Sequence, residues 1–314
     1  MGSGKMNLRR SGASNSFGPE GLGLRSLLFL PACLLVLALT AVSCAPTQAE
    51  KPAAPVAPKV ALVLGAGASR GFAHIGVLKV LAANGIPINM IVGTSAGSLV
   101  AALYAYGYNP FDIQKLALSI QKSDIADFGL PDDGFIRGRR LQDFVNRAVK
   151  NTPIEKMKVP LYIVATDLQS GSEVVFGRGN TGMAVRASCS IPGVFRPELI
   201  NGRQYVDGGV VSPVAVDVAR KYGANFVIAV DISSDADQAA STSTIGTILR
   251  SVDIMYSKIC GAELAKADIV IRPKVGEIGA ADFSRRDDAI MEGEKAALAA
   301  LPAIRQKLAL MQAR

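Results

Sequence analysis

The sequence predicts an α/β domain of three layers, with helices covering both faces of a mostly parallel sheet. Short continuous apolar runs, typical of strands buried on both faces, alternate along the chain with segments that carry apolar residues at helical spacing. No internal repeat is visible. The predicted strands are 60–64, 90–92, 161–165, 226–230 and 269–271, and the predicted helices are 70–83, 96–106, 111–121, 139–150, 213–222, 245–265 and 289–311.

Composition excludes several classes of protein. The 314 residues are 49% hydrophobic and 19% charged, which excludes disorder for most of the chain. Four cysteines are too few for a disulfide scaffold of this length. His74 is the single histidine, so a multi-histidine metal site is impossible and any Ser-His-Asp triad would have to use that residue. We expect no metal site.

The N-terminal region has the parts of an export signal. Basic residues within the first 25 positions precede an uncharged, largely apolar run over 26–49, and the run contains the sequence AVSC ending at Cys44. This ending resembles a bacterial lipobox, so we expect residues 1–43 to be a lipoprotein signal peptide and Cys44 to be acylated. A different cleaved signal and an uncleaved membrane anchor remain open. Under each of these interpretations the rest of the chain is exported. If the protein is a lipoprotein, we expect it on a bacterial membrane, preferably the outer membrane, where it faces the periplasm or the cell exterior.

The remaining chain divides into a short tether and one domain. Residues 44–58 are rich in Ala and Pro and read as an extended tether, and residues 59–314 form one predicted domain. Removing residues 1–43 lowers the formal net charge from +8 to +5, which suits an anionic lipid surface or simply a solvated basic surface. The sequence has no dense stripe of Lys and Arg with interleaved aromatic residues, so it does not predict nucleic-acid binding. Cys189 and Cys260 read as buried apolar side chains, and a disulfide between them stays open.

A glycine-rich loop follows the first predicted strand. It reads Gly65-Ala66-Gly67-Ala68-Ser69-Arg70-Gly71 and leads into a helix. Such a loop directs backbone N–H groups toward an anion at a helix N-terminus. A phosphate-binding P-loop would need a lysine that is missing here. A dinucleotide fingerprint would need an acid about 20 residues further on, and the chain has none between Glu50 and Asp112. An oxyanion hole and a tight packing turn are the remaining readings.

A candidate nucleophile follows the second predicted strand. Gly93-Thr94-Ser95-Ala96-Gly97 fits G-x-S-x-G between a strand and a helix, which is the context in which this motif presents a reactive serine. The sharp turn requires very small flanking residues, and the helix N-terminus favours developing negative charge. The alternative is a small-residue turn in which Ser95 only caps the helix.

The general base is predicted to be a carboxylate. An α/β-hydrolase places its histidine after the nucleophile, but no histidine follows Ser95. Asn201-Gly202 predicts a hairpin turn, and the second arm delivers Asp207 at its end, followed by Gly208 and Gly209. Asp167, at the end of the strand 161–165, is the alternative, although a carboxylate there is also typical of a turn cap.

These motifs, in this order, resemble the patatin-like phospholipase family, with the strongest similarity to bacterial members near the neuropathy-target-esterase branch. The resemblance extends over residues 59 to about 232 and includes GFAHIGVLKVL, VATDLQSGSEVVF and RASCSIPGVFRP. The family often has three consecutive glycines before x-Arg-Gly, where this chain has Ala66, Gly67 and Ala68. This departure leaves open which amides line the oxyanion hole, since alanine resists positive φ.

The resemblance implies an enzyme with a Ser-Asp dyad and no cofactor. Ser95 would be the nucleophile, Asp207 the general base, and the loop from Gly65 to Gly71 the oxyanion hole, with Arg70 in the family's basic position. The implied substrates are phospholipids or lysophospholipids at a membrane surface that the lipid anchor would hold close. A lipid-binding protein without catalysis and a nucleotide-dependent enzyme are the rival functions. The sequence does not indicate the oligomeric state, the preferred head group or the preferred acyl chain.

Overall fold

The computed structural model describes residues 57–125, 127, 136–233 and 243–313. The predicted signal peptide, Cys44 and the tether up to residue 56 lie outside the described residues. The domain that begins near residue 59 is built around one sheet of eight strands. These are β1 (Val60–Leu64), β2 (Met90–Thr94), β3 (Leu161–Asp167), β4 (Glu173–Phe176), β5 (Glu198–Ile200), β6 (Arg203–Asp207), β7 (Phe226–Val230) and β8 (Ile269–Ile271).

Most of the sheet is parallel. The strand order is β5-β6-β3-β2-β1-β7-β8, with β4 pairing β3 from the side. Strands β3, β2, β1, β7 and β8 run parallel, whereas β4, β5 and β6 pair in antiparallel fashion at the β3 end. The predicted mixed α/β fold with a mostly parallel sheet is confirmed.

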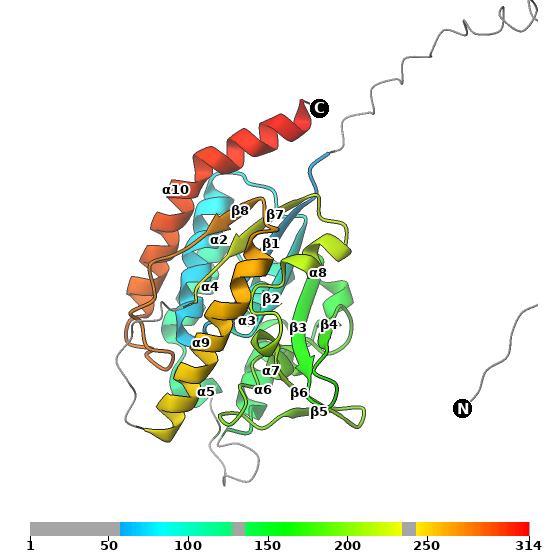
Figure 1. Ribbon diagram of the computed structural model, residues 1–314, viewed down its shortest axis with the longest axis vertical. Helices are drawn as coiled ribbons and strands as arrows, with labels where there is room; N and C mark the ends of the chain where they lie inside the picture. Colours follow the sequence, from blue (N-terminus) through cyan, green and yellow to red (C-terminus); the bar gives the residue numbers. More distant parts are fainter. Residues whose placement is uncertain (1–56, 126, 128–135, 234–242, 314) are drawn as a thin grey trace, which may run out of the picture. The chain divides into compact units, whose positions relative to one another are not determined.

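Helices cover both faces of the sheet, as Figure 1 shows. They are α2 (Ala73–Ala83), α3 (Ala96–Tyr106), α4 (Pro110–Ser119), α5 (Lys122–Ile125), α6 (Arg139–Ala148), α7 (Thr181–Ser188), α8 (Val216–Lys221), α9 (Thr244–Leu264) and α10 (Arg286–Gln312). The described residues also include three 3₁₀ turns: η1 (Ala68–Phe72), directly before α2, η2 (Ile154–Lys156) and η3 (Gly208–Val210). Within the described residues, no helix is long and apolar enough to cross a membrane.

The alternating side chains of β1 divide the core into two layers. Val60, Leu62 and Leu64 pack in the cluster with α2, α3, α4 and α10, whereas Ala61 and Val63 pack with α8 and the C-terminal part of α9. All five side chains of β1 are fully buried. A strand buried on both faces reads as a continuous apolar run because neither face contacts water, which is why this strand was visible in the sequence.

Sequence periodicity missed the short elements near the antiparallel end. Strand β4 and helix α7 were not predicted, and the helix expected from residue 70 begins at Ala73, after the 3₁₀ turn η1. Helix α7 has only 8 residues and starts at an Asn180 side-chain cap. An element of two turns shows little periodicity, and tertiary packing rather than local pattern stabilises it.

Candidate active site

Two strands meet end to end on one edge of β3. Thr94, the last residue of β2, pairs with Val164, and Asp207, the last residue of β6, pairs with the next residue, Ala165. Both Val164 and Ala165 also pair with β4. Strand β4 therefore occupies one edge of β3, and β2 and β6 share the opposite edge. Since β2 and β6 run toward each other, their final residues deliver Ser95 and Asp207 to the same point.

Ser95 occupies a strained turn between β2 and α3. Its φ and ψ are 53° and −126°, an unusual conformation for a residue with a side chain. A Cβ on Gly93 would lie 2.5 Å from Ser98 Cα, and one on Gly97 would lie 2.1 Å from the Leu64 carbonyl oxygen. Both flanking glycines are therefore required by close packing. The Ser95 side chain makes no capping hydrogen bond to α3, so the reading of Ser95 as only a helix cap does not describe this turn.

The Ser95 hydroxyl donates directly to the Asp207 carboxylate. Ser95 Oγ lies 2.5 Å from Asp207 Oδ2, and both side chains are buried, with Asp207 fully so. The other oxygen, Oδ1, accepts hydrogen bonds from the Gly209 amide at 2.8 Å and from the Tyr256 hydroxyl at 2.9 Å. Burial raises the pKa of Asp207 to about 6, against the opposing effect of these donors. The site thus contains a carboxylate of raised basicity in contact with a serine.

His74 does not belong to this pair. It is fully buried in α2, and its Nε2–H donates to the carbonyl of Gly65 at 2.8 Å. Burial lowers the pKa of His74 to about 4, so the ring is neutral at physiological pH. The imidazole supports the glycine-rich loop from behind and is not inserted between Ser95 and Asp207.

Asp167 acts as a turn cap. Its Oδ1 accepts the amides of Gln169 and Ser170, and its Oδ2 pairs with Arg203 at 2.7 Å. These bonds, the Ser170 amide first, lower the pKa of Asp167. A carboxylate engaged in this way is a poor base, and Asp207 is the carboxylate that contacts Ser95.

The glycine-rich loop has two amides that are free to bind an anion. The amides of Gly65 and Ala66 donate to the carbonyls of Val230 and Pro213. Within the described part of the chain, the amides of Gly67 and Ala68 have no protein acceptor. Ala68 lines the cavity that contains Ser95 and has a φ of 50°, so this alanine adopts the backbone conformation that the family's glycine would favour.

Arg70 and Gly71, two further residues of the predicted oxyanion loop, have packing roles. The Arg70 side chain is fully buried and donates to both carboxylate oxygens of Asp253 and to the Ile232 carbonyl. Gly71 faces α3, where a Cβ would lie 2.7 Å from the Ala96 side chain. Arg70 therefore joins the loop to α9 and to the Ile232 backbone through hydrogen bonds that involve neither Ser95 nor Asp207.

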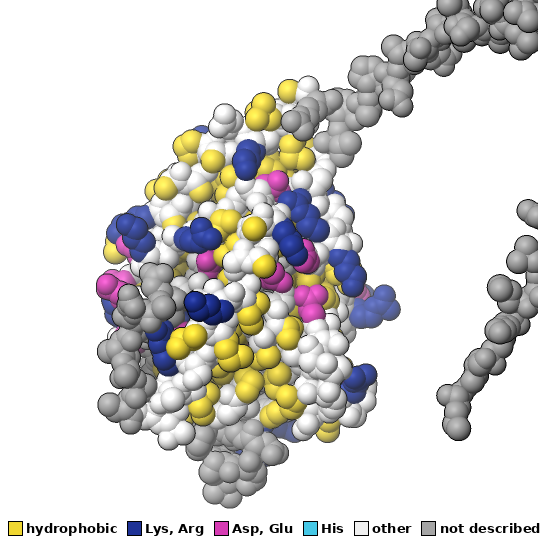
Figure 2. All heavy atoms as spheres, in the orientation of Figure 1, with side chains coloured by type: hydrophobic (Ala, Val, Ile, Leu, Met, Phe, Trp, Pro, Cys, Tyr) yellow, Lys and Arg dark blue, Asp and Glu magenta, His cyan; other side chains and the backbone are white. Residues whose placement is uncertain are grey.

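An apolar cavity of about 430 Å³ opens beside Ser95. Ser95, Ala68 and Cys189 lie on its wall, and aliphatic and aromatic side chains make up most of the rest. They include Leu99, Val100, Leu103, Ile113, Ile120, Ile136, Leu141, Ile191, Val194, Phe195, Leu249 and Phe283. Ile245 of α9 lines the cavity and is exposed, as are Ile254 and Met255 further along the helix. Figure 2 shows hydrophobic side chains gathered over the lower part of the α9 face. The chemistry of the cavity suits a hydrocarbon chain.

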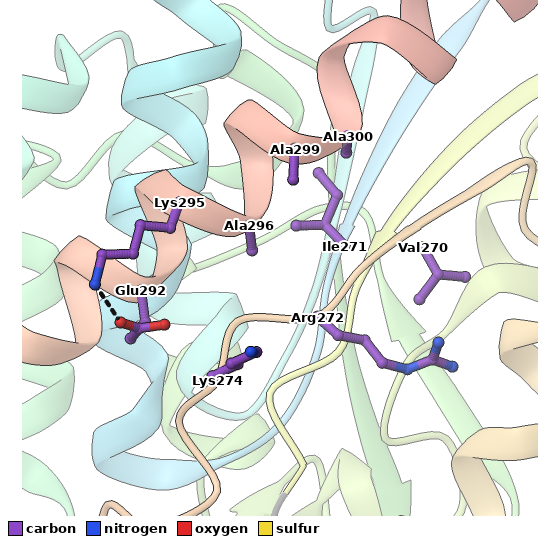
Figure 3. Close-up of a pocket in the computed structure, with 9 residues that line it drawn as sticks. All are labelled: Val270, Ile271, Arg272, Lys274, Glu292, Lys295, Ala296, Ala299 and Ala300. Atoms are coloured by element: carbon purple, nitrogen blue, oxygen red, sulfur yellow. Dashed lines mark hydrogen bonds and ion pairs between the residues drawn. The ribbon is translucent and has the colours of Figure 1, made fainter.

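A second hollow, of about 580 Å³, lies between β8 and α10 (Figure 3). Arg272, Lys274 and Lys295 line it together with alanines of α10, and Lys295 is paired with Glu292. Its lining contains no serine, cysteine or histidine. Ser95 lies on the wall of the cavity of about 430 Å³ and not in this hollow.

Three residues of the site lay beyond the sequence argument. Ser188 of α7 accepts the Ser95 amide at 2.8 Å, and α9 supplies Tyr256 and Asp253. Ser188 lies in RASCSIPGVF, a segment noted in the sequence, but α9 lies outside every motif. Cys189 and Cys260 are free thiols, so they do not form a disulfide. No cluster of three His, Cys, Asp or Glu that could bind a metal occurs among the described residues.

Comparison with known families agrees with this arrangement. The family model for patatin-like phospholipases matches residues 62–220, about half of the chain. The chain belongs to the patatin-like phospholipase family. The match includes the glycine-rich loop, the Ser95 turn and Asp207 of this patatin-like domain, and it ends before α9.

The relatives of this patatin-like chain include bacterial and animal proteins. An uncharacterized NTE family protein of Mycobacterium tuberculosis is 33% identical over 209 residues, which cover 63% of this chain and 58% of that protein. Human patatin-like phospholipase domain-containing protein 6 is 33% identical over 191 residues, which cover 58% of this chain and 14% of that protein. The chain thus spans less than two thirds of the length of these relatives.

A solved structure has the same fold. The crystal structure of VipD from Legionella pneumophila superimposes with a TM-score of 0.56 at 12% sequence identity, covering 80% of this chain and 67% of VipD. At this identity the similarity establishes the patatin-like α/β fold.

Proposed function

We propose that this protein is a serine hydrolase that cleaves acyl esters of lipids, of the phospholipase A or lysophospholipase type. The observation that carries the proposal is the 2.5 Å contact between Ser95 Oγ and Asp207 Oδ2 at the wall of an apolar cavity. Membership of a family named for phospholipases supports lipid esters as the substrate class.

The mechanism begins with a proton transfer from serine to carboxylate. Asp207 accepts the Ser95 proton as Oγ attacks the ester carbonyl carbon, and the Gly67 and Ala68 amides stabilise the oxyanion that forms. One such donor contributes about 3 kcal/mol to transition-state stabilisation. The tetrahedral intermediate collapses, the ester C–O bond breaks, and the leaving alcohol takes the proton from Asp207.

Water then releases the fatty acid. Asp207 accepts a proton from a water molecule as its oxygen attacks the acyl carbon bound to Ser95. The acyl–Oγ bond breaks, and Ser95 Oγ regains the proton from Asp207. The pKa of Asp207, about 6, leaves it ionised at neutral pH and more basic than an exposed aspartate.

Two substitutions and one probe test the proposal. Ser95→Ala and Asp207→Asn should each abolish hydrolysis of phospholipids, lysophospholipids and short esters by purified protein while the circular dichroism spectrum stays unchanged. A fluorophosphonate should label Ser95 in the wild type and leave Ser95→Ala unlabelled. Full activity in either variant would reject the dyad. A folded wild type that resists labelling would favour a lipid-binding protein without catalysis. Thermal stabilisation of the protein by a nucleotide would favour a nucleotide-dependent enzyme.

We also propose that the protein is exported and held at a bacterial membrane by acylation of Cys44. The support is the sequence around that residue, AVSC after an apolar run. Metabolic labelling with an alkynyl fatty acid should modify the wild type and leave Cys44→Ala unmodified, and Cys44→Ala should leave the membrane fraction. Labelling that persists in Cys44→Ala would reject this anchor.

A further inference from the structure

Helix α9 lies outside the region that the family model matches, yet it contacts both halves of the site. The model ends at residue 220, whereas α9 spans Thr244–Leu264. Asp253 and Tyr256 are three positions apart and so share one face of the helix. Both side chains are buried. Asp253 pairs with Arg70 of the glycine-rich loop, and Tyr256 donates to Asp207.

The Tyr256 hydroxyl determines which oxygen of Asp207 faces the nucleophile. Oδ1 receives two donors, the Tyr256 hydroxyl at 2.9 Å and the Gly209 amide at 2.8 Å. Oδ2 receives the Ser95 hydroxyl. A carboxylate held by two donors on one oxygen has little freedom to rotate, and its second oxygen stays directed at the serine.

The Asp-Gly-Gly sequence makes room for the tyrosine ring. A Cβ on Gly209 would lie 2.2 Å from Tyr256 Cζ, far inside van der Waals contact. Any side chain at position 209 would displace the ring and its hydroxyl. The second glycine of the motif therefore has a physical reason that involves a residue 47 positions later in the chain.

We propose that Tyr256 is a positioning residue of the dyad, whose hydroxyl orients Asp207 and stabilises its carboxylate for proton transfer from Ser95. The proposal rests on the proposed function. The same helix holds the oxyanion loop through Asp253 and Arg70, so α9 keeps the base and the oxyanion amides in register with each other.

Two carboxylates that α9 carries or contacts have pKa values raised by burial into the working pH range: Asp207, to about 6, and Glu263, to about 7. Glu263 accepts a hydrogen bond from Ser212. Tyr256 instead donates to Asp207, so removal of the Tyr256 hydroxyl acts on the titration of Asp207.

Burial raises the pKa of the Cys189 thiol at the end of α7 and that of Tyr256 well above its ordinary value, so both stay protonated. Asp253 of α9 is ion-paired with Arg70 of η1. Tyr256 is thus a permanent donor that opposes the effect of burial on the pKa of Asp207.

The test compares two tyrosine-to-phenylalanine variants. Tyr256→Phe keeps the ring against Gly209 and removes only the hydroxyl. Tyr108→Phe removes an equivalent bond, from Tyr108 Oη to the Ala148 carbonyl at 3.0 Å, away from the cavity lining. The kcat and KM for a soluble short-chain ester are measured from about pH 5 to pH 9. For Tyr256→Phe the acidic limb of the kcat profile should move up by about one pH unit, with KM little changed. The limb of Tyr108→Phe should coincide with that of the wild type.

A second replacement gives an effect of opposite sign. Site-specific replacement of Tyr256 by 3,5-difluorotyrosine makes the phenol a stronger donor with nearly the same shape, so the acidic limb should move to lower pH. The 3,5-difluorotyrosine variant also tests the proposal if Tyr256→Phe does not fold. An acidic limb that stays in place in the folded variants, even with a lower Tm or a uniformly lower kcat, would overturn the proposal and leave Tyr256 a packing residue.

Failure of the proposed function is distinguishable from failure of this inference. If the wild type neither hydrolyses esters nor reacts with a fluorophosphonate at Ser95, the proposed function fails. If the wild type does both and the pH profiles coincide, only the role of Tyr256 is rejected.

Discussion

The Ser188 hydroxyl connects the strained nucleophile turn to the central sheet. Ser188 Oγ accepts the Ser95 amide at 2.8 Å and donates to the Val164 carbonyl at 2.6 Å. Ser188 is fully buried at the end of α7. A strained backbone conformation persists only where surrounding contacts hold it. This hydroxyl therefore supplies one of the contacts that keep Ser95 at a φ of 53°.

Removing this hydroxyl should weaken the fold and the site together. Ser188→Ala leaves a buried amide and a buried carbonyl without a partner, which costs about 2–4 kcal/mol of unfolding free energy. Urea denaturation should report that loss, and ester hydrolysis should show a fall in kcat. Thr181→Val is the matched control, since it removes a buried hydroxyl of the same helix that donates to the Thr152 carbonyl. Loss of stability with unchanged kcat in both variants would contradict a role for Ser188 at the nucleophile.

The raised pKa of Asp207 predicts that its ionised carboxylate destabilises the fold at neutral pH. Its pKa is 3.8 unfolded and about 6 folded, so its favourable contribution is complete below about pH 4 and is lost as pH rises through 6. A shift of two units corresponds to about 3 kcal/mol. The unfolding free energy of Asp207→Asn minus that of the wild type should therefore grow by about 3 kcal/mol between pH 4 and pH 8, measured by urea denaturation.

Asp167→Asn provides a control of opposite sign. The pKa of Asp167 is lowered in the fold, so its stabilisation is present above the unfolded pKa and is lost as pH falls. Its stability difference from the wild type should stay nearly constant between pH 8 and pH 4, and it should change in the direction opposite to that of Asp207→Asn only as the pH falls below about 4. A pH-independent difference for Asp207→Asn would contradict the burial of an ionised Asp207.

Ala68 predicts a stabilising substitution in the oxyanion loop. A φ of 50° costs a residue with a Cβ about 1–2 kcal/mol, and glycine gives back about 0.4–1 kcal/mol through greater freedom of the unfolded chain. Ala68→Gly should thus raise the unfolding free energy by up to about 1 kcal/mol and keep activity, because the N–H remains. Ala66→Gly, in the same loop without positive φ, should lower stability in thermal or urea unfolding. Equal destabilisation by both changes would show that Ala68 is unstrained.

The Arg70–Asp253 ion pair predicts strong coupling between the loop and α9. Asp253→Asn leaves a fully buried guanidinium without a counter-charge, which costs about 3–5 kcal/mol, and the displaced loop should lower kcat for ester hydrolysis. Asp112→Asn, which breaks the exposed pair with Lys115, should change stability by less than about 1 kcal/mol.

A double substitution separates the charge from the packing. Arg70→Met combined with Asp253→Leu removes both charges and should recover much of the stability lost in Asp253→Asn. If urea unfolding instead finds Asp253→Asn as stable as the wild type, the ion pair does not hold the loop.

Although it missed β4, local pattern predicted the five parallel strands, the Ser95 turn and the hairpin arm that ends at Asp207. Each of these depends on residues within about ten positions of one another: apolar runs, very small residues around a serine, and Asn-Gly between two arms. The absence of a histidine after Ser95 also followed from the sequence and indicated a carboxylate base before any coordinates.

Tertiary structure alone decided which groups of the site are engaged and which are free. The contacts that join Tyr256 to Asp207, Ser188 to Ser95 and Asp253 to Arg70 connect residues 49, 93 and 183 positions apart. No periodicity encodes such contacts, because they arise where separate elements pack together and bury one another's polar groups.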